Sequence, residues 1–382
     1  MVYEAAEDSF LLKRNISAHA SGRVLDMGTG SGILANEAKK YADEVVAADI
    51  DGEAIEQCKI NIEGINFVKS DLFENIHGKF DLIIFNPPYL PDDKGCRETS
   101  LHGGKKGYET IEKFINSIDK HMKKECRILM LFSSLTKKEK VDEIIRKKCL
   151  IFKEIDRESL FFEKLYVYLI EKSPLLKELE SKGINDIKYF TSGKRGVLYE
   201  GIYKKNKVII KSKNPLSQAS GKMRNEAIML KKLNKHEIGP KIISSGEEYI
   251  IYYFIEGVMF PHYIRKNTYK NIRNVLGKLF TQLKILDELG VNKEEMHKPN
   301  KHILINEKTR DVVMIDFERA TFTLKPHNIT QFITYLTSGP IFSILLDKGF
   351  NLERKKLLQM AKDYRQGSIE AEDIKNYIEN EI

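Results

Sequence analysis

The chain has 382 residues and a formal net charge of +8, with 42% hydrophobic and 31% charged residues. This composition provides both a packed core and a solvated surface, which excludes a disordered chain, a fibre and a small disulfide-stapled module. The longest fully apolar run, residues 249–255, is far shorter than the roughly 20 residues that a transmembrane helix needs. The N-terminal sequence MVYEAAEDSF lacks the basic start of a secretory signal. We therefore expect a cytoplasmic protein without a membrane span.

The charges and the cysteines indicate two domains with different partners. Residues 1–170 hold 26 Lys and Arg against 29 Asp and Glu, whereas the remainder holds 37 against 26. A near-neutral half joined to a basic half favours separate domains, and the basic half is suited to RNA, a phosphorylated ligand or an acidic protein. The four cysteines form no CxxC pair, so neither disulfides nor a structural zinc site is expected.

The first half alternates short apolar segments with amphipathic ones. The clearest helix is predicted over residues 107–123, where Ile111, Phe114 and Ile118 fall on one face. Such alternation predicts an α/β fold of the Rossmann-like type, with a doubly wound, mostly parallel sheet of seven strands. The last two strands are separated by a short loop and should form an antiparallel hairpin. The predicted strands are 23–26, 44–49, 65–71, 80–85, 127–133, 150–156 and 163–170.

A charged segment separates the two halves. We place a linker at 173–186, between a first domain at 1–172 and a second at 187–382, because the stretch contains one Pro, one Gly and many charges. Beyond it, the pattern changes to an α+β arrangement. The predicted strands are 197–203, 208–211 and 249–255, and the predicted helices lie around 223–233 and 269–289.

A glycine-rich loop follows the first predicted strand. The sequence Gly28-Thr29-Gly30-Ser31-Gly32 stands before a helix, where bare backbone and free N–H groups favour a carboxylate or a phosphate. Its GxGxG spacing differs from the dinucleotide-binding GxGxxG, so a plain strand-to-helix turn is the competing interpretation. Asp49 ends the second strand and Asp71 follows the third. Both are common capping residues, but together with the loop they favour one adenosine-bearing ligand.

The fourth strand ends in Asn86-Pro87-Pro88-Tyr89. Two prolines stiffen the backbone and remove two N–H donors, which leaves carbonyl groups available to a substrate. The Asn86 amide oxygen and the Pro87 carbonyl can accept both hydrogens of a planar NH₂ group, and Tyr89 offers a ring for stacking. This is the arrangement that methylation of an amide or an exocyclic amine requires. A proline-rich turn without function is the alternative.

These motifs carry a family resemblance. Residues 1 to about 171 resemble the class I S-adenosylmethionine-dependent methyltransferases of the HemK/PrmC glutamine-N5 group, in the branch found in archaea and eukaryotes. The resemblance implies methylation of the glutamine in a Gly-Gly-Gln loop of a translation release factor, and a small zinc-binding activator subunit as a partner. Ala5-Ala6 stands where the family usually has a proline. The matching pieces are YEAAEDSFLL, LDMGTGSG, AADID, SDLF, NPPYLP and HGGKKGYETIEKFI.

The resemblance also assigns roles to the residues singled out above. It implies that Asp71 and Leu72 lie by the adenine, and that Glu7 and Asp8 lie near the mouth of the cofactor site. The same Asn-Pro-Pro-Tyr motif occurs in adenine-N6 methyltransferases of DNA and RNA, which flip the base into the site. That alternative stays open, although the net charge of the first half disfavours unaided binding to nucleic acid. The residues implied to hold S-adenosylmethionine are Gly28, Thr29, Gly30, Ser31, Gly32 and Asp49, and those implied to hold the target amide are Asn86, Pro87, Pro88 and Tyr89.

The second half resembles small Rio-like or lipopolysaccharide-kinase-like proteins over residues 187 to about 330. The segment VIIK presents Lys211 as the lysine that contacts ATP phosphates, and Glu226 lies on the following helix as its partner. VMIDFE places Asp316 where a kinase binds Mg²⁺. The resemblance thus implies a nucleotide site with ATP and Mg²⁺ as ligands.

The expected catalytic loop departs from the kinase pattern. Kinases keep Asp five residues before Asn. Here the Asn position is His302 and the Asp position is His297, with Glu295 as a substitute if the loop is longer. Glu318 stands where the metal-binding DFG motif has Gly. A degenerate nucleotide-binding module, an atypical kinase and a structural domain therefore all remain open, and the first is favoured.

Overall fold

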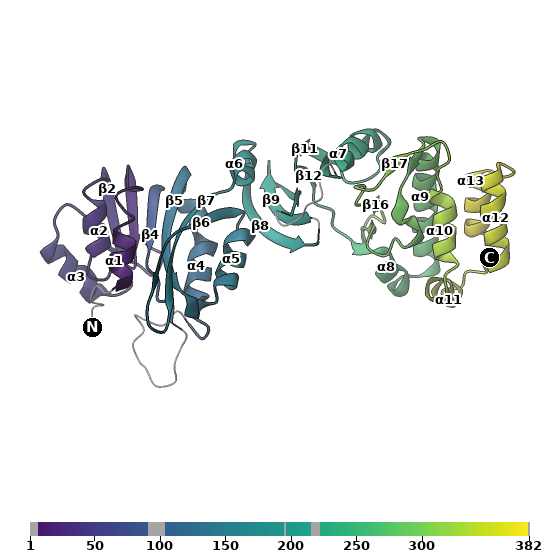
Figure 1. Ribbon diagram of the computed structural model, residues 1–382. Helices are drawn as coiled ribbons and strands as arrows, with labels where there is room; N and C mark the ends of the chain where they lie inside the picture. Colours follow the sequence, from purple (N-terminus) through teal and green to yellow (C-terminus); the bar gives the residue numbers. More distant parts are fainter. Residues whose placement is uncertain (1–6, 91–103, 195, 215–221, 381–382) are drawn as a thin grey trace. The chain divides into compact units, whose positions relative to one another are not determined.

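The computed structural model describes residues 7–90, 104–194, 196–214 and 222–380. The chain divides into two compact units, Met1–Tyr189 and Phe190–Ile382 (Figure 1). Several positions of the motifs quoted above lie outside the described residues, namely 3–6, 91 and 102–103.

The first unit is built on a seven-stranded sheet with the order β3-β2-β1-β4-β5-β7-β6. The pairs β2–β3, β1–β2, β1–β4 and β4–β5 are parallel, whereas β7 runs antiparallel to both β5 and β6. The predicted sheet and its terminal antiparallel hairpin are therefore confirmed. The strands are β1 Arg23–Met27, β2 Glu44–Asp49, β3 Asn66–Lys69, β4 Phe80–Phe85, β5 Met122–Ser133, β6 Leu150–Ser159 and β7 Lys164–Lys172.

Helices cover both faces of this sheet because its central strands are apolar on both sides. Helices α1, α2 and α3 pack on one face, in a core that Leu12, Leu34 and Ile55 share with Val24 and Leu82 of the strands. Helices α4 and α5 lie together on the other face (Figure 1). The helices are α1 Glu7–Lys13, α2 Ile33–Ala38, α3 Gly52–Asn61, α4 Glu109–Ser117, α5 Lys138–Lys147 and α6 Pro174–Ser181, with short 3₁₀ turns η1 Ile118–His121 and η2 Ser134–Thr136.

Two segments differ from their predicted form. The helix predicted over 107–123 ends as α4 at Ser117, and Met122 instead begins β5, where it pairs with Phe80. Met122 is buried in either arrangement, so its apolar side chain could not distinguish helix from strand. The segment 173–186 contains α6, and its last residues belong to β8.

The second unit contains a five-stranded sheet with the order β11-β12-β10-β9-β8, whose paired strands β9, β10, β12 and β11 run antiparallel. Two small sheets, β13-β15-β16 and β14-β17, follow along the chain. The strands are β8 Ile184–Ser192, β9 Gly196–Tyr203, β10 Asn206–Lys213, β11 Ile242–Ser245, β12 Tyr249–Tyr253, β13 Val258–Met259, β14 Val291–Asn292, β15 Ile303–Ile305, β16 Val312–Met314 and β17 Thr321–Phe322.

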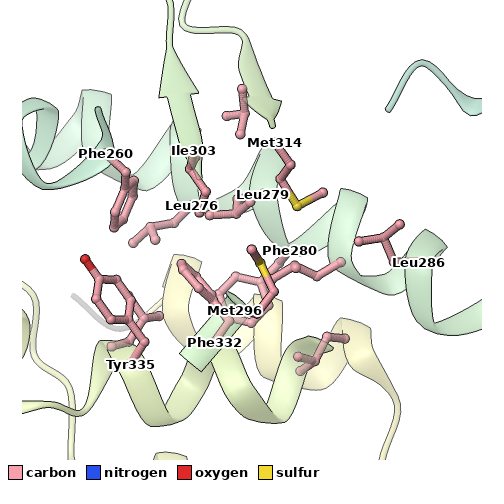
Figure 2. Close-up of a cluster of buried hydrophobic side chains, with 14 of the residues drawn as sticks. Phe260, Leu276, Leu279, Phe280, Leu286, Met296, Ile303, Met314, Phe332 and Tyr335 are labelled. Atoms are coloured by element: carbon pink, nitrogen blue, oxygen red, sulfur yellow. The ribbon is translucent and has the colours of Figure 1, made fainter. Parts of the chain in front are cut away.

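A helical layer around α9 completes the second unit. Buried side chains of α9, including Leu276, Leu279 and Phe280, pack against Met296 and Phe332 in one apolar cluster (Figure 2). An antiparallel sheet with one following helix, then a helical body with short hairpins, is the α+β arrangement expected from the sequence of this half. The helices are α7 Lys222–Leu233, α8 Phe260–Lys266, α9 Tyr269–Glu288, α10 Asn328–Leu336, α11 Gly339–Asp347, α12 Arg354–Gln366 and α13 Ala371–Asn380, with 3₁₀ turns η3 Asn234–His236 and η4 Glu294–His297.

Within the described ranges, no single helix has the length and apolarity to cross a bilayer. One bent pair, α10 with α11, meets these two criteria together, with a 70° bend between its members.

A buried amide fixes the start of α10 to the loop after α9. Asn328 is fully buried, and its Nδ2 donates to Asp287 Oδ1 and to the Val291 carbonyl, both at 2.6 Å. Its Oδ1 accepts a hydrogen bond of 2.8 Å from the Lys293 backbone N–H. This side chain therefore satisfies backbone groups that have no contact with water, and it sets the path of the chain at Lys293.

We expect Asn328→Ala to lower the free energy of unfolding of the second unit by about 2–4 kcal/mol, because it leaves a buried carbonyl and a buried N–H unpaired. Urea titration of the full chain measures the change. Thr334→Ala, at an exposed position of the same helix, is the control and should change stability by less than about 0.5 kcal/mol. Equal effects from both substitutions would contradict a structural role for the Asn328 amide.

Candidate functional site

The parallel strands of the first unit bring the glycine loop, Asp49 and the Asn-Pro-Pro-Tyr corner to one edge of the sheet. Met27, the last residue of β1, pairs with Ala48 of β2 and with Phe85 of β4. The next residue of each strand is thus Gly28, Asp49 or Asn86. A Cβ on Gly28 would lie 3.8 Å from the Asn86 carbonyl oxygen. The loop and the corner are therefore direct neighbours.

The glycine loop depends on backbone conformations that favour glycine. Gly28, Gly30 and Gly32 have φ values of +68°, +51° and +77°, in the left-handed region. The Asp49 carboxylate holds the loop, because its Oδ2 accepts from the Gly30 N–H at 2.8 Å and its Oδ1 accepts from the Asp51 N–H at 2.9 Å. Each oxygen still has a second lone pair, so Asp49 retains the capacity to accept hydroxyl groups of a ribose.

Asp26 lies beneath this loop. It is fully buried, and the Thr29 hydroxyl donates to its Oδ2 at 2.6 Å. Burial raises the pKa of Asp26 to about 7, against the opposing hydrogen bond from Thr29. Its Oδ1 has no hydrogen-bond partner among the described residues. The Thr29 side chain, which the sequence placed at the cofactor, is thus committed to Asp26.

The side chain of Asn86 is oriented by Asp8. Its Nδ2 donates to Asp8 Oδ2 at 3.1 Å, and the Tyr89 hydroxyl donates to the same oxygen at 3.3 Å. The Ser9 N–H holds the other oxygen of Asp8 at 2.6 Å. Because Nδ2 faces Asp8, the amide oxygen points elsewhere. Asn86 Oδ1 is buried and has no hydrogen-bond partner within the described part of the chain.

The remaining predicted residues lie around this edge. Glu7 is exposed at the start of α1, next to Asp8, and Ser31 is exposed in the glycine loop. Asp71 is exposed beyond β3, and Leu72 follows it with a φ of +45°. At the corner itself, Pro87 is buried, whereas Pro88 and Tyr89 are half-buried.

A second cluster of charged groups lies in the second unit. Lys211 on β10 forms ion pairs with Glu226 Oε2 at 2.7 Å and with Asp316 Oδ1 at 2.8 Å. Glu226 is 1% exposed, and its other oxygen accepts from the Phe317 N–H at 3.2 Å. Burial opposes the charge on Lys211, but the two carboxylates outweigh it and raise its pKa. Both carboxylates contact Lys211 where it is largely shielded from solvent, since its side chain is 13% exposed.

A fully buried lysine, which sequence reasoning missed, joins this cluster to the loop around η4. Lys293 Nζ donates to the Asp316 carbonyl and lies 3.3 Å from Glu295 Oε2. Its ammonium group also lies 4.6 Å from the centre of the Phe317 ring. Burial lowers the pKa of Lys293. The charged run around Lys293 is typical of a solvated loop, so no signal in the sequence indicated its burial.

The two histidines of the predicted catalytic loop have different surroundings. His302 Nδ1 lies 3.8 Å from Asp316 Oδ2, whereas His297 is exposed and its Nδ1 lies 2.8 Å from the Glu294 carbonyl. Glu295, not His297, contacts the cluster, through Lys293. Burial and the charge of Lys293 lower the pKa of His302. Glu295 belongs to the short 3₁₀ turn η4, and its carboxylate lies beside Lys293.

We expect the pH to control how much Asp26→Asn stabilises the protein. The folded-state pKa of about 7 exceeds the ordinary value of 3.8, so below pH 7 the folded state binds a proton that the unfolded state has lost. Stability should thus fall as pH rises towards 7, by about 1.4 kcal/mol per pH unit, and level off above it. The Asn variant lacks this penalty. Urea titrations at pH 5, 6, 7 and 8 should show its advantage growing up to pH 7.

Asp43→Asn, at an exposed aspartate before β2, serves as the control. It should differ from the unmodified protein by a constant amount at every pH. A constant difference for Asp26→Asn as well would show that Asp26 is ionised in the folded state throughout this range.

Comparison with solved structures finds neighbours for each part of the chain. The Mtq2–Trm112 complex of E. cuniculi, described as responsible for methylation of the eRF1 translation termination factor, has a chain 25% identical at a TM-score of 0.40, covering 45% of this chain and 99% of that one. The bifunctional kinase-methyltransferase WbdD is 13% identical at a TM-score of 0.45, covering 92% of this chain and 85% of that one.

Sequence comparison concerns the first unit. "Putative protein N5-glutamine methyltransferase MJ0928" of Methanocaldococcus jannaschii is 41% identical over 154 residues, which are 37% of this chain and 78% of that protein. The tRNA1(Val) (adenine(37)-N6)-methyltransferase of Bacteroides fragilis is 33% identical over 126 residues, 29% of this chain and 53% of that protein. Residues 7–154 match the family model described as "Methyltransferase small domain". Through its first unit, this chain therefore belongs to the S-adenosylmethionine-dependent methyltransferases of the methyltransferase small domain family.

Proposed function

We propose that the first unit methylates the side-chain amide nitrogen of a protein glutamine, in the Gly-Gly-Gln loop of a translation release factor. The observation that carries this proposal is the buried Oδ1 of Asn86, which has no hydrogen-bond partner among the described residues, while Asp8 holds the amide nitrogen. A buried acceptor without a partner costs free energy in the folded protein, and an incoming NH₂ group removes that cost.

The residues at the strand ends fit S-adenosylmethionine. The backbone of Gly28 and Gly30 has no Cβ to hinder a ligand, and Asp49 offers carboxylate lone pairs for ribose hydroxyls. Beneath the loop, Asp26 adds a second buried oxygen that has no hydrogen-bond partner among the described residues. When bound, this cofactor supplies an electrophilic methyl group on a sulfonium sulfur.

The corner then has to hold a planar amide. Asn86 Oδ1 and the Pro87 carbonyl accept its two hydrogens, so the nitrogen is directed rather than deprotonated. An N–C bond forms as the S–C bond breaks, and the nitrogen afterwards releases one proton to water. Because the amide lone pair is conjugated, positioning supplies most of the rate acceleration. The Tyr89 hydroxyl donates to Asp8, and its ring offers a surface on which the plane of the amide can stack.

A protein substrate is favoured over a nucleic acid. The relative that matches 78% of its own length is named for glutamine, whereas the relative named for tRNA adenine matches 53%. The net charge of residues 1–170 is also slightly negative, which disfavours phosphate binding. We further propose that a small zinc-binding activator subunit assists the enzyme, as the family resemblance implies.

The choice of substrate is tested by measuring the transfer of a tritiated methyl group by the full chain, with and without a co-expressed activator. Release factor, total tRNA and duplex DNA are offered side by side. We expect label in the release factor and none after its Gly-Gly-Gln glutamine is changed to alanine. Label in tRNA instead would favour adenine-N6 methylation, for which the basic second half would supply the RNA contact.

In the same assay, Asn86→Ala should reduce kcat about 10²- to 10³-fold, the usual cost of losing one preorganised hydrogen-bonding group. The dissociation constant of the cofactor should stay within about twofold, because Asn86 holds the substrate amide that receives the methyl group and does not hold the methyl donor. Asn61→Ala, an exposed asparagine at the end of α3, is the matched control. Unchanged kcat in Asn86→Ala would contradict the proposed mechanism.

For the second unit we propose nucleotide binding, with ATP and Mg²⁺ as the ligands that the kinase resemblance implies. The supporting observation is the buried Lys211–Glu226 pair beside Asp316. Pairing two charges in the interior brings little net stability, so such a cluster is better explained by a ligand that it serves. Glu226 holds Lys211, and Lys211 in turn can donate to phosphate oxygens.

Lys211→Met should weaken the binding of a non-hydrolysable ATP analogue about 10- to 100-fold, since a charge-assisted hydrogen bond contributes about 1.5–3 kcal/mol. Isothermal titration calorimetry with the full chain measures the affinity. Lys213→Met removes a lysine from the same strand that pairs with Glu248 and should leave the affinity unchanged. No binding to the unmodified chain would exclude this second function.

A further inference from the structure

One acceptor atom near the charged cluster has no partner. His302 Nδ1 is buried and makes no hydrogen bond to any described residue. Asp316 Oδ2 lies 3.8 Å away from it. Such a distance is too long for a hydrogen bond. In the tautomer that carries its proton on Nε2, the imidazole offers a lone pair at Nδ1.

The two oxygens of Asp316 face different partners. Oδ1 accepts from Lys211 at 2.8 Å, whereas Oδ2 faces His302. Asp316 itself has a φ of +64°, an uncommon backbone conformation for a residue other than glycine. Strain of this kind is retained where the surrounding structure holds a side chain in a required direction. The free oxygen of Asp316 is thus held toward the imidazole.

The elements that carry these two residues are fixed by the core. Ile303, directly after His302, and Met314, two residues before Asp316, are both fully buried and pair across β15 and β16. Figure 2 shows both side chains in the apolar cluster. The core therefore holds the backbone of His302 and of Asp316 in place, which favours a preorganised pair of metal ligands.

We propose that His302 and Asp316 together bind the divalent cation that accompanies the nucleotide, and that the imidazole ligand makes this site prefer a first-row transition ion, Mn²⁺, over Mg²⁺. The inference rests on the nucleotide binding proposed above. In protein kinases an asparagine oxygen takes the position of His302. Mg²⁺ takes oxygen ligands almost exclusively, whereas transition ions accept imidazole nitrogen as well as phosphate oxygens.

The separation of the donors fits such an ion after a small movement. Neighbouring ligands of an octahedral cation, with bonds of about 2.1 Å, lie about 3 Å apart. Approach of Nδ1 and Oδ2 by less than 1 Å from the observed 3.8 Å is therefore sufficient. No group of three or more His, Cys, Asp or Glu side chains in the described ranges is arranged to hold a metal alone. The other ligands must come from phosphate oxygens and water, so the ion should bind only with the nucleotide.

The test measures the affinity of the full chain for a non-hydrolysable ATP analogue at saturating Mg²⁺ or saturating Mn²⁺. We expect binding about tenfold tighter with Mn²⁺. His302→Asn restores an oxygen ligand and should bring the two affinities close together. His297→Asn makes the same chemical change at an exposed histidine five residues away and should keep the Mn²⁺ preference.

A spectroscopic readout reports the ligand directly. Electron spin echo envelope modulation of Mn²⁺ bound with the analogue should show coupling to a ¹⁴N nucleus in the unmodified chain and in His297→Asn, and none in His302→Asn. Absence of nucleotide binding with either metal would overturn this inference together with the nucleotide site. Binding without Mn²⁺ preference, or a preference and ¹⁴N coupling that persist in His302→Asn, would overturn the inference alone.

Discussion

The hydrogen bond from Asn86 Nδ2 to Asp8 is the interaction on which the chemistry proposed for the first unit depends. An amide side chain can present either its oxygen or its nitrogen to a substrate, and only the oxygen can accept a hydrogen from an NH₂ group. Asp8 accepts from both Asn86 and Tyr89, so it settles both orientations at once. Asp8 is itself 5% exposed and held by the Ser9 N–H, so this preference is built into the folded chain before any ligand arrives.

In the second unit, ion pairs orient charged side chains in the way that hydrogen bonds orient the Asn86 amide. Lys211 pairs with the buried Glu226 and with the half-buried Asp316, and Lys293 donates to the Asp316 carbonyl. Arrangements of this kind contribute little to stability because desolvation offsets the attraction between the charges. Such pairs instead hold each charged side chain in one orientation. Asn328 helps to position this cluster, because its buried side chain accepts a hydrogen bond from the backbone N–H of Lys293.

Much of this architecture could be predicted from residue patterns. The alternation of apolar strands and amphipathic helices predicted the parallel sheet, and the ends of its strands marked Gly28, Asp49 and Asn86 as neighbours. The prediction was wrong for Met122, whose burial is compatible with a helix and with a strand. In the second unit, the loop before β15 left His297 and Glu295 as alternatives, because the spacing of residues does not show which side chain of a turn faces the interior. The structure places Glu295 at the cluster and His297 at the surface.

The sequence by itself determined which residues stand at the ends of the strands, because parallel pairing follows from local periodicity and the order of elements. Only the tertiary structure decided which atoms of those residues are free. Asp8 and Asn86 lie 78 positions apart, and Lys211 and Asp316 lie 105 apart. The direction of an amide, the burial of Lys293 and the unpaired nitrogen of His302 each depend on such distant contacts. No local pattern encodes them, since they arise only when separate segments pack against each other.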